Sequence, residues 1–264
     1  MQPILQSRLP EAIWMNPATE RLPGILPVAG EDWLRLDDAY AGQMAERDRL
    51  IAADPDVVHA LLPGARAAAG ELLDLVLDRL TRLPGFTFAA DHVLRPDGAR
   101  IPLDRSAPLL TLGRLVQTDF CILMPDMAPG AQAEHLLAGA ILCFPASWTL
   151  SQKIGRPLTR IHVPVPEYGP NLAARVQRLF DAIRPEQPLW RGNALIYDDP
   201  TLHQPRAEGV ARPQPIQKLY LRSERQCLLR LPQSRAVVFA IHTTVIRIAD
   251  LDPEARASLL AARA

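Results

Sequence analysis

The sequence predicts an α+β protein in which helices cover an antiparallel sheet of about five strands. Apolar runs typical of strands occur in pairs separated by short breaks, and helical periodicity lies mainly before residue 85 and between the pairs. Strands and helices do not alternate regularly, so a parallel sheet is not expected. We expect a helical N-terminal region over residues 1–85 that packs on a core domain over residues 86–264, the two forming one compact unit.

Helical spacing predicts two helices in the N-terminal region, one within residues 31–53 and one within residues 65–83. Further along the chain, Asn171 is expected to cap a helix over residues 171–183, because its side-chain oxygen can accept from the first free N–H groups. The residues expected on the buried faces of the three helices are Trp33, Leu36, Tyr40, Met44, Leu50, Leu72, Leu73, Val76, Leu80, Leu172, Val176, Leu179 and Ile183.

Four apolar runs predict two hairpins. Residues 113–124 and 134–144 flank a loop that contains proline and glycine, and residues 218–231 and 235–248 are joined by a link of three residues. Residues 193–199 are expected to add a fifth strand.

The composition is that of an ordinary globular protein, with 48% hydrophobic residues. Acidic and basic residues are equal in number, 29 of each, so no charge excess favours nucleic acid or a membrane surface as a partner. The N-terminus lacks a charged leader followed by an unbroken apolar run, so a cytoplasmic location is expected. Cys121, Cys143 and Cys227 lie in separate apolar stretches, and we expect them to be buried, reduced thiols.

Common catalytic and cofactor motifs are absent: the sequence has no glycine-rich dinucleotide or phosphate loop, HExxH, GxSxG or CxxC. Isolated histidines therefore remain as candidate ligands for a metal or haem. His59, His92, His135 and His203 are expected to be surface or capping residues, whereas His162 and His242 have more unusual surroundings.

His162 lies in the sequence IHVPVP. Pro164 and Pro166 restrict the residues before them to extended conformations, so we expect a stiff extended segment that presents the imidazole in one direction. Such a segment suits an axial ligand. A ligand or catalytic role and a purely structural role are both open at this point.

His242 lies in the apolar run 235–248, on the same side of the predicted strand as Val238 and Ala240. Both sides of this strand are apolar, as in a buried central strand. His242 is therefore expected to be either a core histidine that is hydrogen-bonded to a neighbour or a histidine in a pocket.

Several motifs carry a family resemblance. The run CFPASWTLSQKIGRPLTRIHVPVP, with LVQTDFCILM before it and LRSERQCLLRLPQSRAVVFAIHT after it, resembles the haem-dependent oxidative N-demethylase family. The stretches DWLRLDDAYAGQMAERDRL and VLDRLTRLPGFTF are similar to the N-terminal portion of that family. The similarity covers residues 20–248 in the family's order.

The resemblance implies a PAS-like fold that encloses haem b, and a monooxygenase reaction on a small N-methylated amine such as dimethylamine. O2 and two electrons would oxidise a methyl group, and the resulting carbinolamine would release formaldehyde. The chain would be the haem subunit, and its electrons would come from a reductase or from partner subunits, because it has no flavin, nicotinamide or iron–sulfur motif.

The resemblance also implies roles for individual residues. His162 would be the proximal haem ligand, and Lys153, Arg156 or Arg160 would pair with the haem propionates. Trp148 would pack against the porphyrin or fill the core.

Three polar residues, Arg222, Glu224 and Gln226, share one face of the predicted strand 218–231. They are expected either to be solvated or to form a buried network, in which Glu224 pairs with an arginine. As catalytic residues we predict His242, Glu224 and Arg222, with His242 on the distal side of the haem, either as a hydrogen-bond donor to O2 or as a second ligand.

The chain departs from the family pattern at three positions. Ala194 stands where related sequences tend to have tryptophan, His242 where they tend to have arginine, and Thr118 where an acidic residue is common. If these residues line the pocket, they change its shape and its charge.

Alternative functions follow from the same residues. The chain could be a non-enzymatic haem sensor or carrier of PAS-like fold, or an interaction domain without a cofactor. A haem–thiolate enzyme that uses Cys143 is a weaker variant, because the sequence around this residue does not resemble a thiolate-ligand loop.

Overall fold

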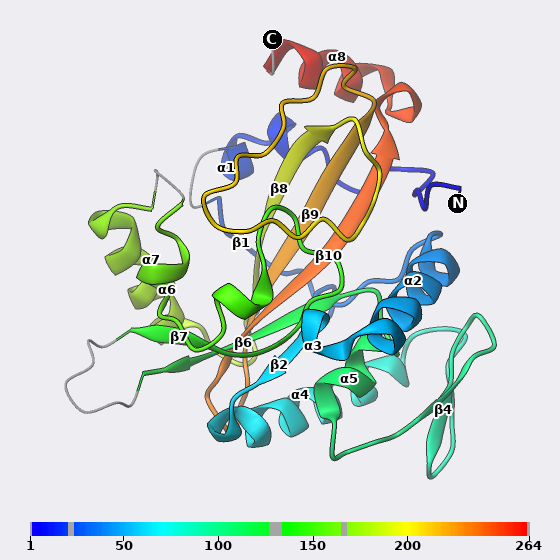
Figure 1. Ribbon diagram of the computed structural model, residues 1–264, viewed down its shortest axis with the longest axis vertical. Helices are drawn as coiled ribbons and strands as arrows, with labels where there is room; N and C mark the ends of the chain where they lie inside the picture. The colour runs from blue at the N-terminus through cyan, green and yellow to red at the C-terminus, as the bar shows by residue number, and fades with distance from the viewer. Residues whose placement is uncertain (1, 21–23, 127–133, 165–167, 263–264) are drawn as a thin grey trace.

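The computed structural model describes residues 2–20, 24–126, 134–164 and 168–262, and it confirms the α+β class (Figure 1). A seven-stranded sheet has the order β1-β8-β9-β10-β6-β7-β2, and every neighbouring pair in it is antiparallel. Its strands are β1 (Leu26–Pro27), β2 (His59–Leu61), β6 (Asp119–Pro125), β7 (His135–Ile141), β8 (Leu189–Tyr197), β9 (Tyr220–Arg230) and β10 (Val237–Arg247).

The helices cover both faces of this sheet. They are α1 (Pro17–Glu20), α2 (Tyr40–Ala53), α3 (Pro55–Val58), α4 (Arg66–Leu80), α5 (Pro108–Gly113), α6 (Leu158–Ile161), α7 (Pro170–Ala182) and α8 (Pro253–Ala262). Within the described residues, none of them is both long enough and apolar enough to cross a membrane.

Both predicted hairpins are present. The strands β9 and β10 pair over their full lengths, from Val237 opposite Arg230 to Arg247 opposite Tyr220. The link between them closes at Arg235, whose φ of 60° is in the left-handed region. The strands β6 and β7 form the other hairpin, with an irregular register between Ile122 and Leu123, and their loop at 127–133 lies outside the described residues.

The predicted fifth strand is β8, which begins four residues earlier than expected. The prediction of about five strands missed both edges of the sheet, because β1 and β2 have only two and three residues and carry no alternating pattern. Both edge strands come from the first 85 residues. A second, three-stranded sheet of β3 (Thr87–Phe88), β4 (His92–Leu94) and β5 (Arg100–Pro102) was also not predicted.

Two predicted helices begin elsewhere than expected. The helix α2 starts at Tyr40, because the side chain of Asp37 accepts the N–H of Ala39 and turns the chain before the helix. The helix α7 starts at Pro170, and its N-cap is Gly169, so the prediction of Asn171 as the cap was wrong. Proline suits the first position of a helix because its φ is already helical and its missing N–H would have no helical partner there.

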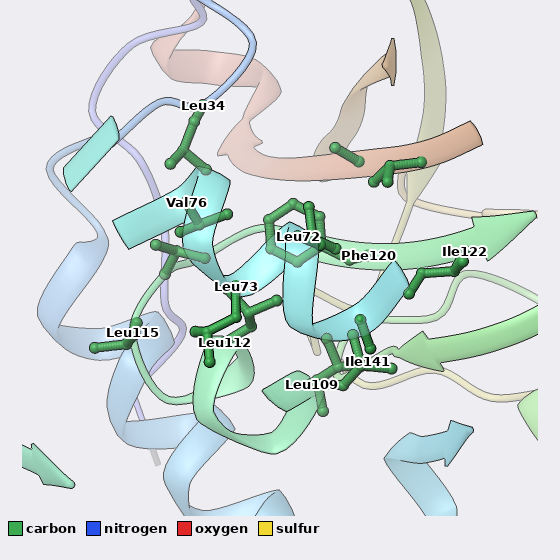
Figure 2. Close-up of a cluster of buried hydrophobic side chains, with 14 of the residues drawn as sticks. Leu34, Leu72, Leu73, Val76, Leu109, Leu112, Leu115, Phe120, Ile122 and Ile141 are labelled. Carbon is green, nitrogen blue, oxygen red and sulfur yellow. The ribbon is translucent and has the colours of Figure 1, made fainter. Parts of the chain in front are cut away.

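The two faces of the sheet have separate apolar cores. On one face, which we call the α4 face, helix α4 packs against β6 and β10 (Figure 2). Side chains of this core are Leu72, Leu73, Val76, Leu109, Leu112, Phe120, Ile122 and Val238. On the other face, which we call the α7 face, α6 and α7 pack over a smaller core that includes Leu158, Phe180, Ile183, Cys121, Leu228, Val237 and Ile241.

Candidate functional site

His162 ends the short helix α6 on the α7 face. The prediction of an extended segment at this residue was wrong, since His162 has φ −99° and ψ 5° and its backbone N–H donates to the carbonyl of Leu158. The prolines at 164 and 166 restrict only the residues directly before them, which leaves residues 158–162 free to form a helical turn. Val165 and Pro166 lie outside the described residues.

The imidazole of His162 is held in one tautomer. Its Nδ1 lies 2.8 Å from the carbonyl oxygen of Leu158, and because a carbonyl only accepts, Nδ1 carries the proton. Burial lowers the pKa of His162, and the charges of Lys153 and Arg191 lower it further, so the ring is neutral at pH 7. The ring also stacks on Tyr168, with centroids 4.2 Å apart. The lone pair of Nε2 therefore belongs to a neutral, oriented imidazole, as a metal ligand requires.

Three cations were expected to pair with the haem propionates, and they have different surroundings in the structure. Lys153 donates to the carbonyl of Ile161 and lies over the ring of Trp148, 5.9 Å from its centroid. Arg160 forms an ion pair of 2.9 Å with Glu208. Arg156 is exposed. The structure therefore brings Lys153 and Trp148 close to His162, whereas the charge of Arg160 is already matched.

The polar face of β9 is a buried network. Arg222 Nε lies 3.3 Å from the carboxylate of Glu224, and Gln226 donates to the same carboxylate at 3.0 Å. The predicted pairing of Glu224 with an arginine is thus present. Arg222 also donates to the carbonyls of Leu202, at 2.8 Å, and Phe144, at 2.6 Å, which ties two loops to the sheet.

The neighbouring strand β8 supplies a residue that was not predicted for the site. Arg191 lies opposite Gln226, on the same face as Glu224, and its Nε is buried without a hydrogen-bond partner among the described residues. Burial lowers the pKa of Arg191, against the charge of Glu224, which raises it. The charge of Arg191 also contributes to the lowered pKa of His162. From the sequence, only Ala194 of this strand had been considered for the site.

The long segment between β8 and β9, residues 198–219, crosses in front of β8, β9 and β10 (Figure 1). Gln204 of this segment pairs with the loop after β7 by backbone hydrogen bonds to Pro145 and Ser147, and His203 binds the carbonyl of Cys143. The segment is thus fixed to the loop after β7, and the ion pair of its Glu208 with Arg160 also ties it to α6. It also carries Arg206 and Arg212, which had not been predicted as site residues.

His242 lies on the opposite face of the sheet. It pairs with Arg225, while the next residue, Thr243, pairs with Glu224. Its Nε2 is 2.8 Å from a carboxylate oxygen of Asp37, so the alternative of a core histidine bonded to a neighbour is the one observed. A distal position opposite His162 is excluded for His242 because the sheet separates the two side chains.

The other two departures from the family pattern also lie away from His162. Ala194 packs on the α4 side with Ile13 and Ile196, in a third apolar cluster. Thr118 is buried just before β6, and its carbonyl accepts from Arg47. These three positions therefore do not reshape the space around His162, contrary to the expectation drawn from the sequence.

The carboxylate of Asp37, the partner of His242 on the α4 face, makes the stability of the protein sensitive to acid. Burial raises its pKa, but the hydrogen bonds and charge of His242 and the hydrogen bonds of Gln117 and Gln6 outweigh this and lower the pKa of Asp37 to about 2. Since the unfolded value is about 3.9, the ionised group stabilises the fold above about pH 4, by about 2 kcal/mol, and this contribution is lost as the pH falls towards about 2. We expect Asp37→Asn to remove this difference.

The measurement is the free energy of unfolding of wild type and Asp37→Asn in denaturant, between about pH 5 and about pH 2. The difference between the two proteins should shrink as the pH falls. Curves that stay parallel over this range would show that Asp37 does not carry the effect.

Two further candidates for a metal ligand have other surroundings. His135, predicted at the surface, is buried on the α7 face, where it contacts Phe180 and bonds to Gln177. Cys143 is buried, and burial raises its pKa to about 12, which disfavours a thiolate. All three cysteines are free and buried, as predicted.

Among the described residues, the site on the α7 face thus has a neutral imidazole whose Nε2 has no hydrogen-bond partner, an apolar core beneath it, and arginine N–H groups that are buried without a partner. This set of donors fits a flat, apolar ligand that contains a metal and carries negative charge. Haem has these properties.

A family model described as "Haem-dependent oxidative N-demethylase, alpha subunit-like" matches residues 24–263 of the chain. The description indicates dependence on haem and, through the term alpha subunit, an assembly with partner subunits.

Proposed function

Since the chain belongs to the haem-dependent oxidative N-demethylase, alpha subunit-like family, we propose that it binds haem b through His162 and oxidatively demethylates a small N-methylated amine such as dimethylamine. The observation that carries the proposal is the hydrogen bond from His162 Nδ1 to the Leu158 carbonyl, which leaves Nε2 for iron. When bound, haem supplies the activation of O2 that oxidation of an N-methyl group needs.

Residues of the chain hold the proton on the His162 imidazole, and they orient both this ring and the carboxylate of Glu224. The Leu158 carbonyl keeps the proton on Nδ1, and the stacked ring of Tyr168 fixes the plane of the imidazole. Glu224, held by Arg222 and Gln226, is the buried carboxylate that can accept a hydrogen bond from the amine of the substrate. We keep the catalytic assignment for Glu224 and Arg222, and not for His242, which lies behind the sheet.

The remaining parts of the proposal concern the setting of the chain. We place it in the cytoplasm as the haem subunit of a complex, with electrons supplied by a reductase or by partner subunits. The five long or central strands β6 to β10 are the part of the sheet that we propose as PAS-like, with the short strands β1 and β2 as additions at its edges. The balanced reaction consumes O2, two electrons and two protons, and it yields formaldehyde, water and the demethylated amine.

The test is expression with added haem, followed by absorption spectra of the ferric, ferrous and CO-bound protein. We expect a Soret band in all three states and, with dimethylamine and an artificial reductant, formaldehyde in amounts that depend on the amine. A protein that binds haem and CO but releases no formaldehyde from any small N-methylated amine would be the sensor or carrier. Absence of any Soret band would refute the haem assignment.

A further inference from the structure

The segment 198–219 and the end of β8 together hold three polar groups that are shielded from water and have no hydrogen-bond partner among the described residues. Arg206 Nε, Arg212 Nη1 and the hydroxyl of Tyr197 are each buried and lack a hydrogen bond within the described residues. Tyr197 as a whole is 7% exposed. Buried polar groups in folded proteins nearly always have a partner, so three such groups in one region indicate a ligand.

The three groups are close in space. The guanidinium of Arg212 lies over the ring of Tyr197, 4.8 Å from its centroid. Arg206 donates to the carbonyl of Ala211, the residue directly before Arg212. The two guanidiniums therefore belong to one turn of the loop, next to the end of β8.

Neither arginine has an ion pair in the described part of the chain. Both arginines are partly buried, and a guanidinium N–H that is shielded from water without an acceptor is costly, because its loss of hydration is not balanced by a hydrogen bond. Two such cations and a phenol hydroxyl together match the needs of two carboxylates, since arginine binds a carboxylate through paired N–H groups.

The same loop is fixed to the helix that ends at His162. Glu208, two residues after Arg206, forms the 2.9 Å ion pair with Arg160, and its backbone N–H donates to the side chain of Gln152 at 2.9 Å. The part of the segment that carries Arg206 is therefore anchored to α6, while the arginine on α6 itself is neutralised.

We propose that Arg206 and Arg212, with the hydroxyl of Tyr197, bind the two propionate carboxylates of the haem. This inference rests on the proposed function, because it takes His162 as the haem ligand. It replaces the assignment of the propionates to Lys153, Arg156 or Arg160 that the family resemblance implied. The ammonium of Lys153 donates to the carbonyl of Ile161. Arg160 is already paired with Glu208, and Arg156 is exposed to solvent.

The experiment compares haem with haem dimethyl ester, in which both carboxylates are uncharged. Each is titrated into the apoprotein and followed by the Soret band, for wild type, Arg206→Gln/Arg212→Gln and Arg156→Gln. Wild type and Arg156→Gln should bind haem at least roughly tenfold more tightly than the ester, since charge-assisted hydrogen bonds are involved. The double variant should lose this preference through weaker binding of haem, while its affinity for the ester stays unchanged.

Tyr197→Phe is a second variant that removes one hydroxyl and keeps the ring under Arg212. It should reduce haem affinity by a smaller factor than the double variant, again with no effect on the ester. Midpoints of denaturant unfolding for the apoproteins show whether each variant is folded.

Three results with wild type or the double variant would overturn the inference: equal binding of haem and ester by wild type, an unchanged preference in the double variant, or an equal loss of affinity for both ligands in the double variant. A preference lost in Arg156→Gln instead would return the propionates to that residue and also overturn it. A wild-type protein without a Soret band for either ligand would refute the proposed function itself, which is a distinct outcome.

Discussion

Replacement of His162 by glycine is expected to abolish the Soret spectrum of the haem-loaded protein or change it to that of haem without its axial ligand. His162 is the imidazole on the α7 face whose Nδ1 is fixed by a carbonyl and whose Nε2 is free for iron. Glycine leaves a space at the end of α6, so added imidazole should enter it and restore the wild-type spectrum. The measurement is a set of ferric, ferrous and CO spectra with and without imidazole.

His135→Ala is the matched control for this experiment. His135 is also a buried histidine of the α7 face, and burial lowers its pKa as well, but it is committed to Gln177 and Phe180. We expect its replacement to leave the haem spectrum intact. If His135→Ala removed the Soret band and His162→Gly did not, the axial ligand would be assigned to β7.

The second large effect is expected in stability, on replacement of Arg47 by methionine. Arg47 is fully buried in α2, lies 2.6 Å from Asp119, and also donates to the carbonyls of Gly113 and Gln117. Removal of the cation leaves the Asp119 carboxylate buried without its charge partner. The free energy of unfolding should fall by about 3–5 kcal/mol, as measured by denaturant titration.

Arg49→Met is the control on the same helix. Arg49 pairs with Glu46 at the surface and is 54% exposed, so its loss should leave the free energy of unfolding nearly unchanged, since water screens exposed ion pairs. A similar, small effect of both substitutions would show that the buried pair does not hold α2 to the sheet.

The sequence predicted those parts of the fold in which local pattern and final structure agree. The hairpin of β9 and β10 was predictable because two long runs flank a short polar link, and its alternation placed Arg222 and Glu224 on one face. The edge strands β1 and β2 were not, because strands of two or three residues exist only through pairing with a longer neighbour.

The candidate site was predicted only in part, for a similar reason. The nearby prolines distinguish His162 in the sequence. They do not determine the backbone at this residue, which is the C-cap of helix α6. Arg206 and Arg212 lie in a segment rich in proline and charge that is typical of solvated loops. Their partial burial depends on how the segment crosses the sheet, which no local pattern reveals. The partner of His242 could not be predicted either, because Asp37 is far away in the sequence and only the fold brings the two residues together.

The backbone N–H and carbonyl of Phe144 connect two buried polar clusters. The N–H of Phe144 donates to Asp119, the partner of Arg47, while its carbonyl accepts from Arg222, the partner of Glu224. A single residue thus connects the buried ion pair of the core to the polar network of the candidate site. We therefore expect the ion pair and the network to open together as one cooperative unit, so that the site persists until the protein unfolds globally.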